Sequence, residues 1–246
     1  MNNENLLIGN RASEPTEQGR LATSLSENNE ALRPMRKISE LQNEIHDVII
    51  YAQRNQSLLP ESVEYCQEHG VPLINLTSGN TPPLPENPNF LYLSCPNIAL
   101  EVIDTMAEIQ HTCEIIDRPF TLAITEHHQS SKEDISKTAR AISDAASTII
   151  NCSNITGDYR HILPVRNLPT TQKRFEVPPK NEGGYAIHEV RLLSQHYREI
   201  IHEFEPIEVY GREAYNEGLS WVIATINQIE SITGPLSINE FRSRYT

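Results

Sequence analysis

The residues best suited to chemistry lie in one short stretch, EHHQSSKEDISKTARA, at positions 126–141. His128 and Lys132 lie four residues apart, just after an apolar run of strand length. A histidine can donate a proton near neutral pH, and a lysine adds a full positive charge. Ser136 and Thr138 stand at the start of an expected helix, where backbone N–H groups and the helix dipole favour an anion. The stretch therefore suits a small carboxylate whose neighbouring atom must gain a proton.

An ordinary capped helix explains the same stretch without a ligand. In that interpretation Asp134 or Ser136 caps the helix, and the histidine and lysine side chains are solvated. Elsewhere the histidines show no metal-ligand spacing, so we expect no metal site and a structural role for His46, His69, His111, His161, His188, His196 and His202.

Composition narrows the class of partner. The formal net charge of −13 repels phosphate backbones, so we expect no nucleic-acid partner, although a local basic pocket can still bind a small anionic metabolite. No stretch reaches the length of a membrane span, and the first thirty residues are too polar for a secretory signal. We therefore expect a cytoplasmic protein whose widely spaced cysteines are free thiols, namely Cys66, Cys95, Cys113 and Cys152.

The first half of the chain alternates strand-like and helical patterns. Apolar runs of strand length occupy 46–52, 71–76 and 90–95, and helical patterns occupy 60–70 and 98–110. This alternation predicts a parallel α/β sheet, with a ligand crevice at the carboxyl ends of its strands. Before it, residues 1–36 fit either a short strand at 6–8 with a weak helix or a disordered segment.

The second half has a different pattern. We expect a strand at 120–128, a helix at 134–150, a loop-rich segment at 152–184, antiparallel strands within 185–193 and 196–210, and a helix at 212–232. The predicted fold class is therefore α/β: a doubly wound parallel-sheet domain plus an α+β domain with a mainly antiparallel or mixed sheet. We place the first domain at 1–97 plus 213–246 and the second, for substrate binding and oligomerisation, at 98–212.

The stretch at 126–141 resembles the signature of the dihydrodipicolinate reductase family, E-x-H-Q-x-x-K-x-D-x-S-G-T-A-K-A. Further segments are similar to that family in the same order: DVIIYAQRNQSLLPESVEYCQEHGVPLINLTSG, SCPNIALEV, and a last one that ends in R-x-x-Y-x-x-G at Arg212, Tyr215 and Gly218. The resemblance covers roughly residues 46–232. It implies a Rossmann-like domain, reduction of a cyclic imine-type dicarboxylate of lysine biosynthesis with NADPH or NADH, and a homo-oligomer, either a dimer or a tetramer.

The resemblance also implies roles for particular residues. His128 matches the proton donor, and Lys132 matches the lysine that holds the substrate and assists protonation. It implies substrate binding by Ser136, Thr138 and Arg212, and we add the neighbouring His127 and Lys137 to the predicted substrate-binding set. The cofactor-binding set that it implies is Thr77, Ser78, Gly79, Pro96 and Asn97.

The sequence departs from the family pattern in three places, two of which lie on the cofactor side. The family's G-x-x-G-x-M-G phosphate loop is replaced by GNRASEPTEQG, in which Gly9 and Gly19 lack the required spacing and two acids repel phosphate. Lys137 replaces a glycine, and its side chain could bind a second carboxylate or block the first. Tyr51-Ala52-Gln53 and Leu76-Thr77 replace the family's D-F-T and G-T.

Three functions remain open from the sequence. The first is a divergent reductase that binds the dinucleotide through a remodelled loop. The second is a lyase, isomerase or dehydratase that acts on a related cyclic amino acid without hydride transfer. The third is a non-catalytic paralogue that binds a metabolite. Dinucleotide binding separates the first from the others, and the effect of replacing His128 separates the second from the third.

Overall fold

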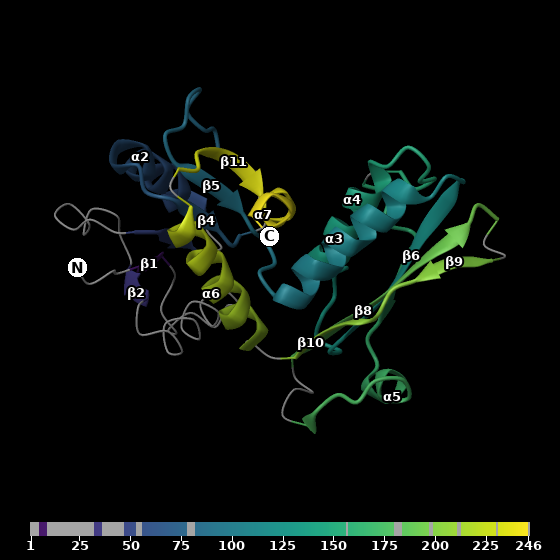
Figure 1. Ribbon diagram of the computed structural model, residues 1–246. Helices are drawn as coiled ribbons and strands as arrows, with labels where there is room; N and C mark the ends of the chain where they lie inside the picture. The colour runs from purple at the N-terminus through teal and green to yellow at the C-terminus, as the bar shows by residue number, and fades with distance from the viewer. Residues whose placement is uncertain are drawn as a thin grey trace. The chain divides into compact units, whose positions relative to one another are not determined.

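The computed structural model describes most of the chain (Figure 1). The described residues are 5–8, 32–35, 47–52, 56–77, 82–155, 157–179, 184–196, 199–210, 213–229 and 231–245. The chain divides into two compact units, one made of Met1–Ile98 with Tyr215–Thr246 and the other of Ala99–Ala214.

The first unit is built on a parallel sheet. Its strands are β1 (Asn5–Ile8), β2 (Leu32–Met35), β3 (Ile49–Tyr51), β4 (Leu73–Asn75), β5 (Leu91–Ser94) and β11 (Gly234–Ser237). They lie in the order β11-β5-β4-β3-β1-β2, and every neighbouring pair is parallel. The order reverses at β1, which lies between β2 and β3, so the carboxyl ends of β1 and β3 mark the point where such sheets bind ligands.

The helices among the described residues of this unit are η2 (Gln56–Leu58), α2 (Leu59–His69), α6 (Glu213–Gln228) and α7 (Ile238–Tyr245). The central strands β3 and β4 are buried throughout, as expected for a parallel sheet with both faces covered. Helix α2 ends at Gly70, whose φ of 67° is left-handed and whose N–H donates to the carbonyl of Cys66 at 2.8 Å.

Helix α6 makes one close backbone contact within the first unit. A Cβ atom placed on Gly218 would lie 1.5 Å from the carbonyl oxygen of Ile98. Only glycine permits this approach, which gives a packing reason for the glycine of the R-x-x-Y-x-x-G segment. Helix α6 buries Leu219, Val222 and Ile226, which lie three to four residues apart on one face of the helix.

The second unit is built on a mixed sheet covered by two helices. Its elements are α3 (Leu100–Ile115), β6 (Phe120–His128), α4 (Lys137–Ser147), β7 (Ile162–Val165), α5 (Leu168–Gln172), β8 (Tyr185–Ser194), β9 (Ile200–Glu203) and β10 (Ile207–Tyr210). Strand β8 pairs antiparallel with β6, β9 and β10, whereas β7 pairs parallel with β6. Figure 1 shows α3 and α4 side by side on this sheet, with α3 in contact with β10 and α4 in contact with β6.

Side chains of β6 alternate between the two faces of this sheet. Phe120, Leu122 and Ile124 are buried on the face that α3 and α4 cover, and Glu126 and His128 continue the same series. The odd-numbered residues, His127 among them, point to the other face, where Phe175, Val177, Tyr185 and Ile187 form a small apolar cluster. Of the last three residues of β6, Glu126 and His128 therefore lie on the helix-covered face, and His127 lies on the opposite face.

The predicted fold class is confirmed: a parallel α/β sheet is joined to a unit with a mixed sheet. Some elements were not predicted. The segment 152–184 contains β7 and α5, and β2, β11 and α7 had no prediction, because their runs of four to eight residues carry too little periodic signal. All four cysteines are free, as predicted. Among the described helices none is long and apolar enough to cross a membrane.

Candidate functional site

A buried ion pair holds the loop that follows β6. Arg166, the first residue after β7, donates from Nη2 to Oε1 of Glu126, whose side chain has no exposed surface. The same guanidinium donates to the carbonyl oxygens of Lys132 at 2.7 Å and of Asp134 at 3.0 Å. Arg166 therefore ties the loop that carries Lys132 to the end of β6.

Helix α4 is attached to the same carboxylate. The N–H of Ser136 donates to Oε2 of Glu126 at 2.8 Å, and the Ser136 hydroxyl accepts from the N–H of Ala139 at 3.0 Å as the helix N-cap. Of the two caps that the sequence left open, Asp134 and Ser136, the helix has Ser136. The Ser136 hydroxyl also lies 2.9 Å from Nε2 of His188 on β8, directly opposite Glu126 in the strand register. Both polar groups of Ser136 are engaged within the protein, so Ser136 positions its neighbours.

Two histidine rings meet in this interior. The rings of His128 and His188 lie edge to face with centroids 5.6 Å apart. Nε2 of His128 and Nδ1 of His188 are buried and have no hydrogen-bond partner. Buried polar atoms are rarely left without a partner, so this pair of nitrogens marks a place where a ligand, an ion or a water molecule belongs.

Burial and charge set the protonation of the cluster. Burial lowers the pKa of His128 to about 4; Glu126 opposes this effect, and the positive charges of Arg166 and Lys132 add to it. Burial also lowers the pKa of His188 to about 3. For Glu126, burial raises the pKa, but the hydrogen bonds from Arg166 and Ser136 outweigh it and the net pKa is lowered. At neutral pH the cluster thus holds one carboxylate and two neutral imidazoles.

His127 belongs to a separate network on the other face. Its Nε2 lies 2.8 Å from Oε1 of Glu189, and its Nδ1 lies 3.1 Å from the hydroxyl of Thr171. Glu189 is also paired with Arg174 at 2.6 Å and with Arg191 at 2.9 Å. Because both ring nitrogens of His127 have partners and its ring faces away from His128, its placement does not support the predicted contact with substrate.

The remaining predicted substrate residues lie around the start of α4. Lys132 is half-buried, and its charge acts on His128. Lys137 is the first residue of α4 and is exposed, whereas Thr138 is buried in the first turn. Arg212 lies outside the described residues. Lys132, His128 and the start of α4 are therefore brought to one end of β6.

Three of the predicted cofactor residues, Thr77, Pro96 and Asn97, are described, and they lie in the first unit at the carboxyl edge of the parallel sheet. Thr77 follows β4, and its N–H and hydroxyl both donate to the side-chain oxygen of Asn75, at 2.9 and 2.7 Å. Pro96 and Asn97 follow the neighbouring strand β5, where the buried Cys95 thiol lies 3.5 Å from the carbonyl of Asn97. Ser78, Gly79 and the segment 9–19, which stands in place of the family's phosphate loop, lie outside the described residues.

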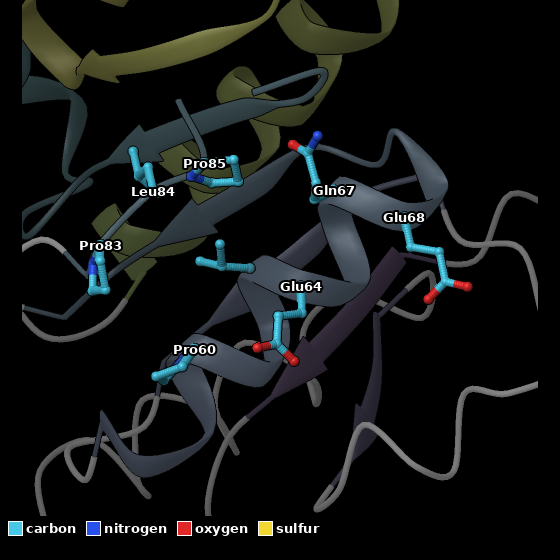
Figure 2. Close-up of a pocket in the computed structure, with 8 residues that line it drawn as sticks. Pro60, Glu64, Gln67, Glu68, Pro83, Leu84 and Pro85 are labelled. Carbon is cyan, nitrogen blue, oxygen red and sulfur yellow. The ribbon is translucent and has the colours of Figure 1, made fainter. Parts of the chain in front are cut away.

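A cavity of about 400 Å³ in the first unit contains none of the predicted residues (Figure 2). It lies between α2 and the segment 83–85, and prolines and aliphatic side chains form much of its wall. Figure 2 shows Glu64 and Glu68 on its α2 side. Two carboxylates and no cation among the described lining residues do not suit an anionic metabolite.

Sequence reasoning missed Arg166 and treated His188 as structural. Arg166 follows a short strand in a segment that was predicted to be loop, so no pattern pointed to it. His188 is far from His128 in sequence, and its position opposite Glu126 depends on the pairing register of β6 and β8. The alternation of β6 does place Glu126 and His128 on one face, and that signal was available from the sequence.

Comparison with known proteins gives similarity in structure alone. No family model matches the sequence, and no curated protein matches it. A dipicolinate-bound dihydrodipicolinate reductase from Paenisporosarcina sp. TG-14 aligns over 96% of this chain and 97% of its own, with a TM-score of 0.59 and 14% identity. This chain has a dihydrodipicolinate reductase-like fold. The family resemblance is thus confirmed at the level of the fold.

A more distant structural neighbour is a C. glutamicum DAP dehydrogenase in complex with DAP. It aligns over 98% of this chain and 94% of its own, with a TM-score of 0.44 and 8% identity.

Proposed function

We propose that this protein is a reductase that transfers hydride from NADPH or NADH to a cyclic imine-type dicarboxylate, of the kind used in lysine and diaminopimelate metabolism. The observation that carries the proposal is the unpartnered Nε2 of His128, buried at the end of β6 beside the charge of Lys132. The dihydrodipicolinate reductase-like fold supports the same conclusion, because its solved example carries dipicolinate, a cyclic dicarboxylate.

His128 is the proton donor of the proposed reaction. Reduction of the double bond adds a hydride to one atom and a proton to its neighbour. Nε2 of His128 makes no hydrogen bond within the protein, so it is available to bind the substrate and to carry that proton. Without a ligand, burial keeps the imidazole neutral. A dicarboxylate placed beside it adds negative charge, which favours the protonated ring that can then deliver the proton.

Lys132 and the first turn of α4 bind the carboxylates. An ammonium group gives a charge-assisted contact of about 1.5–3 kcal/mol, and the N-terminal end of α4 adds a favourable dipole. Lys137 supplies a further charge at the exposed start of the helix. Arg166 and Glu126 act indirectly, by holding the loop and the helix in place.

The parallel sheet offers the place for the dinucleotide. The carboxyl ends of β1 and β3 flank its topological switch point, and Thr77, Pro96 and Asn97 lie on the same edge. When bound, the nicotinamide supplies the hydride. The sequence after β1 lacks the glycine spacing for close approach to a pyrophosphate, so we expect weak binding, with a dissociation constant above about 100 μM.

That missing spacing favours a second candidate function. A chain that binds no dinucleotide would be a non-redox enzyme on a related cyclic amino acid, or a metabolite-binding paralogue. Calorimetric titration with NADPH and NADH separates the candidates. A low-micromolar dissociation constant would refute our expectation for the loop and favour the reductase, whereas no binding at millimolar dinucleotide would refute the reductase.

Replacement of His128 tests the proposed chemistry. His128→Gln should lower turnover of the cyclic imine by about 10²–10⁴-fold, because a general acid is lost. His127→Gln is the matched variant on the opposite face and should cost much less. Circular dichroism checks that both are folded. Equal losses in the two variants would contradict the assignment, and full activity of His128→Gln would remove the catalytic role of the site.

A further inference from the structure

The structure also brings together three side chains with the donor atoms of a transition-metal site. Glu126, His128 and His188 each offer one ligand atom, and the three atoms all lie within 4.8 Å of one another. Three ligand atoms around a zinc ion, each about 2.0–2.2 Å from it, lie roughly 3.3–3.6 Å apart in tetrahedral geometry. Small side-chain movements would therefore close the three atoms around one ion.

Strand pairing fixes the positions of these three side chains relative to one another. Glu126 and His128 are two residues apart on β6 and share the helix-covered face, and His188 stands opposite Glu126 on the antiparallel strand β8. All three residues are at least nine-tenths buried, with 0%, 8% and 1% of their surface exposed. A site on two paired strands is held more precisely than a site on loops.

The second observation is independent of the grouping. Nε2 of His128 and Nδ1 of His188 are buried without any hydrogen-bond partner, and these nitrogens are ligand atoms when they carry a lone pair. Two of the three grouped side chains thus each carry a buried nitrogen that has no hydrogen-bond partner and is able to bind a metal.

Hydrogen bonds with neighbouring residues orient two of the ligands, His188 and Glu126, as is usual in metal sites. In the tautomer that donates from Nε2 to the Ser136 hydroxyl, His188 keeps the lone pair of Nδ1 for the ion. The Glu126 carboxylate accepts from Arg166 and from the N–H of Ser136, and its oxygens retain lone pairs for one more partner. Such outer contacts orient metal ligands, although the charge of Arg166 also weakens the affinity.

From these contacts we infer that Glu126, His128 and His188 form a binding site for a divalent transition-metal ion of the zinc class. Two histidines and one carboxylate are a ligand set of catalytic zinc sites, which keep a further position for water or another small ligand. His128, at the end of β6, is the most exposed of the three.

The metal has a consequence for activity, and this part rests on the proposed function. The ion takes the Nε2 lone pair of His128, so a metal-loaded chain cannot carry the proton that reduction needs. Zinc should therefore inhibit turnover, and a chelator should restore it. The binding of the metal itself does not depend on what reaction the protein catalyses.

Cobalt(II) titration of the full chain, followed by visible absorption, tests the site. The wild type should bind one equivalent, and His128→Gln and His188→Asn should each lose at least about tenfold in affinity. His111→Gln, which removes an exposed histidine on α3, is the matched control and should bind as the wild type does.

The outcomes are distinct from those of the turnover experiments. No bound cobalt in the wild type would overturn the inference, and so would unchanged affinity in His128→Gln. If His188→Asn fails to fold by circular dichroism, His128→Gln decides alone, since its Nε2 makes no contact that the fold needs. Equal loss in His111→Gln would place the metal on the surface and refute the buried site.

Discussion

Replacement of Arg166 by glutamine should strongly destabilise the second unit, although Arg166 lies just after a strand of only four residues. The guanidinium is mostly buried, and it pairs with a carboxylate that has no exposed surface. Removal of one partner of a buried pair leaves the other charge uncompensated, at a typical cost of about 3–5 kcal/mol. The N–H of Ser136 still donates to Glu126 in the variant, so we expect the lower end of that range.

The other contacts of Arg166 widen the effect beyond one ion pair. Its donors also hold the carbonyl oxygens of Lys132 and Asp134, which fix the loop in front of α4. Arg166→Gln should therefore increase hydrogen exchange in β6 and β8 together with this loop. Trp221, the single tryptophan, lies in α6 of the first unit. Its fluorescence reports unfolding of the first unit, which the replacement of Arg166 should leave unchanged.

A double-mutant cycle decides whether the charge pair causes the loss. Glu126→Gln combined with Arg166→Gln removes both charges, so the double variant should be more stable than the sum of the single losses predicts, by about 0.5–3 kcal/mol. Exchange should be measured with a chelator present, because a bound metal would stabilise the folded state. A cost below about 1 kcal/mol for Arg166→Gln, or strict additivity, would refute the reasoning.

Two further predictions follow from single side chains. Pyridine-2,6-dicarboxylate should raise the melting temperature of the wild type and of Lys173→Ala, an exposed control, but not of Lys132→Ala; an unchanged shift in Lys132→Ala would relocate the anion site. Gly218→Ala should lower the free energy of unfolding of the first unit by about 1–3 kcal/mol, because the new methyl group meets the carbonyl of Ile98. Gly184→Ala is the control, since the space around Gly184 is open, and it should leave the stability unchanged. Equal stability of the two variants in urea would contradict the close contact.

Local patterns in the sequence determined much of the architecture. Buried strands in a parallel sheet are continuous apolar runs, so β3, β4 and β5 could be located. The cap of α4 could be narrowed to Asp134 or Ser136, of which the structure has Ser136. Strand alternation also required His127 and His128 to face opposite sides, and the structure places them so. These features depend on residues close together in the chain.

Only the tertiary structure decided what surrounds His128. Its ring meets His188 because β8 pairs with β6 in one register, and a shift of one residue would turn His188 to the other face. Arg166 reaches Glu126 because β7 lies parallel to β6, an arrangement that no short pattern records. Pairing between distant strands is set by packing of the whole sheet, so the unpartnered nitrogens beside a buried carboxylate could not be read from the sequence.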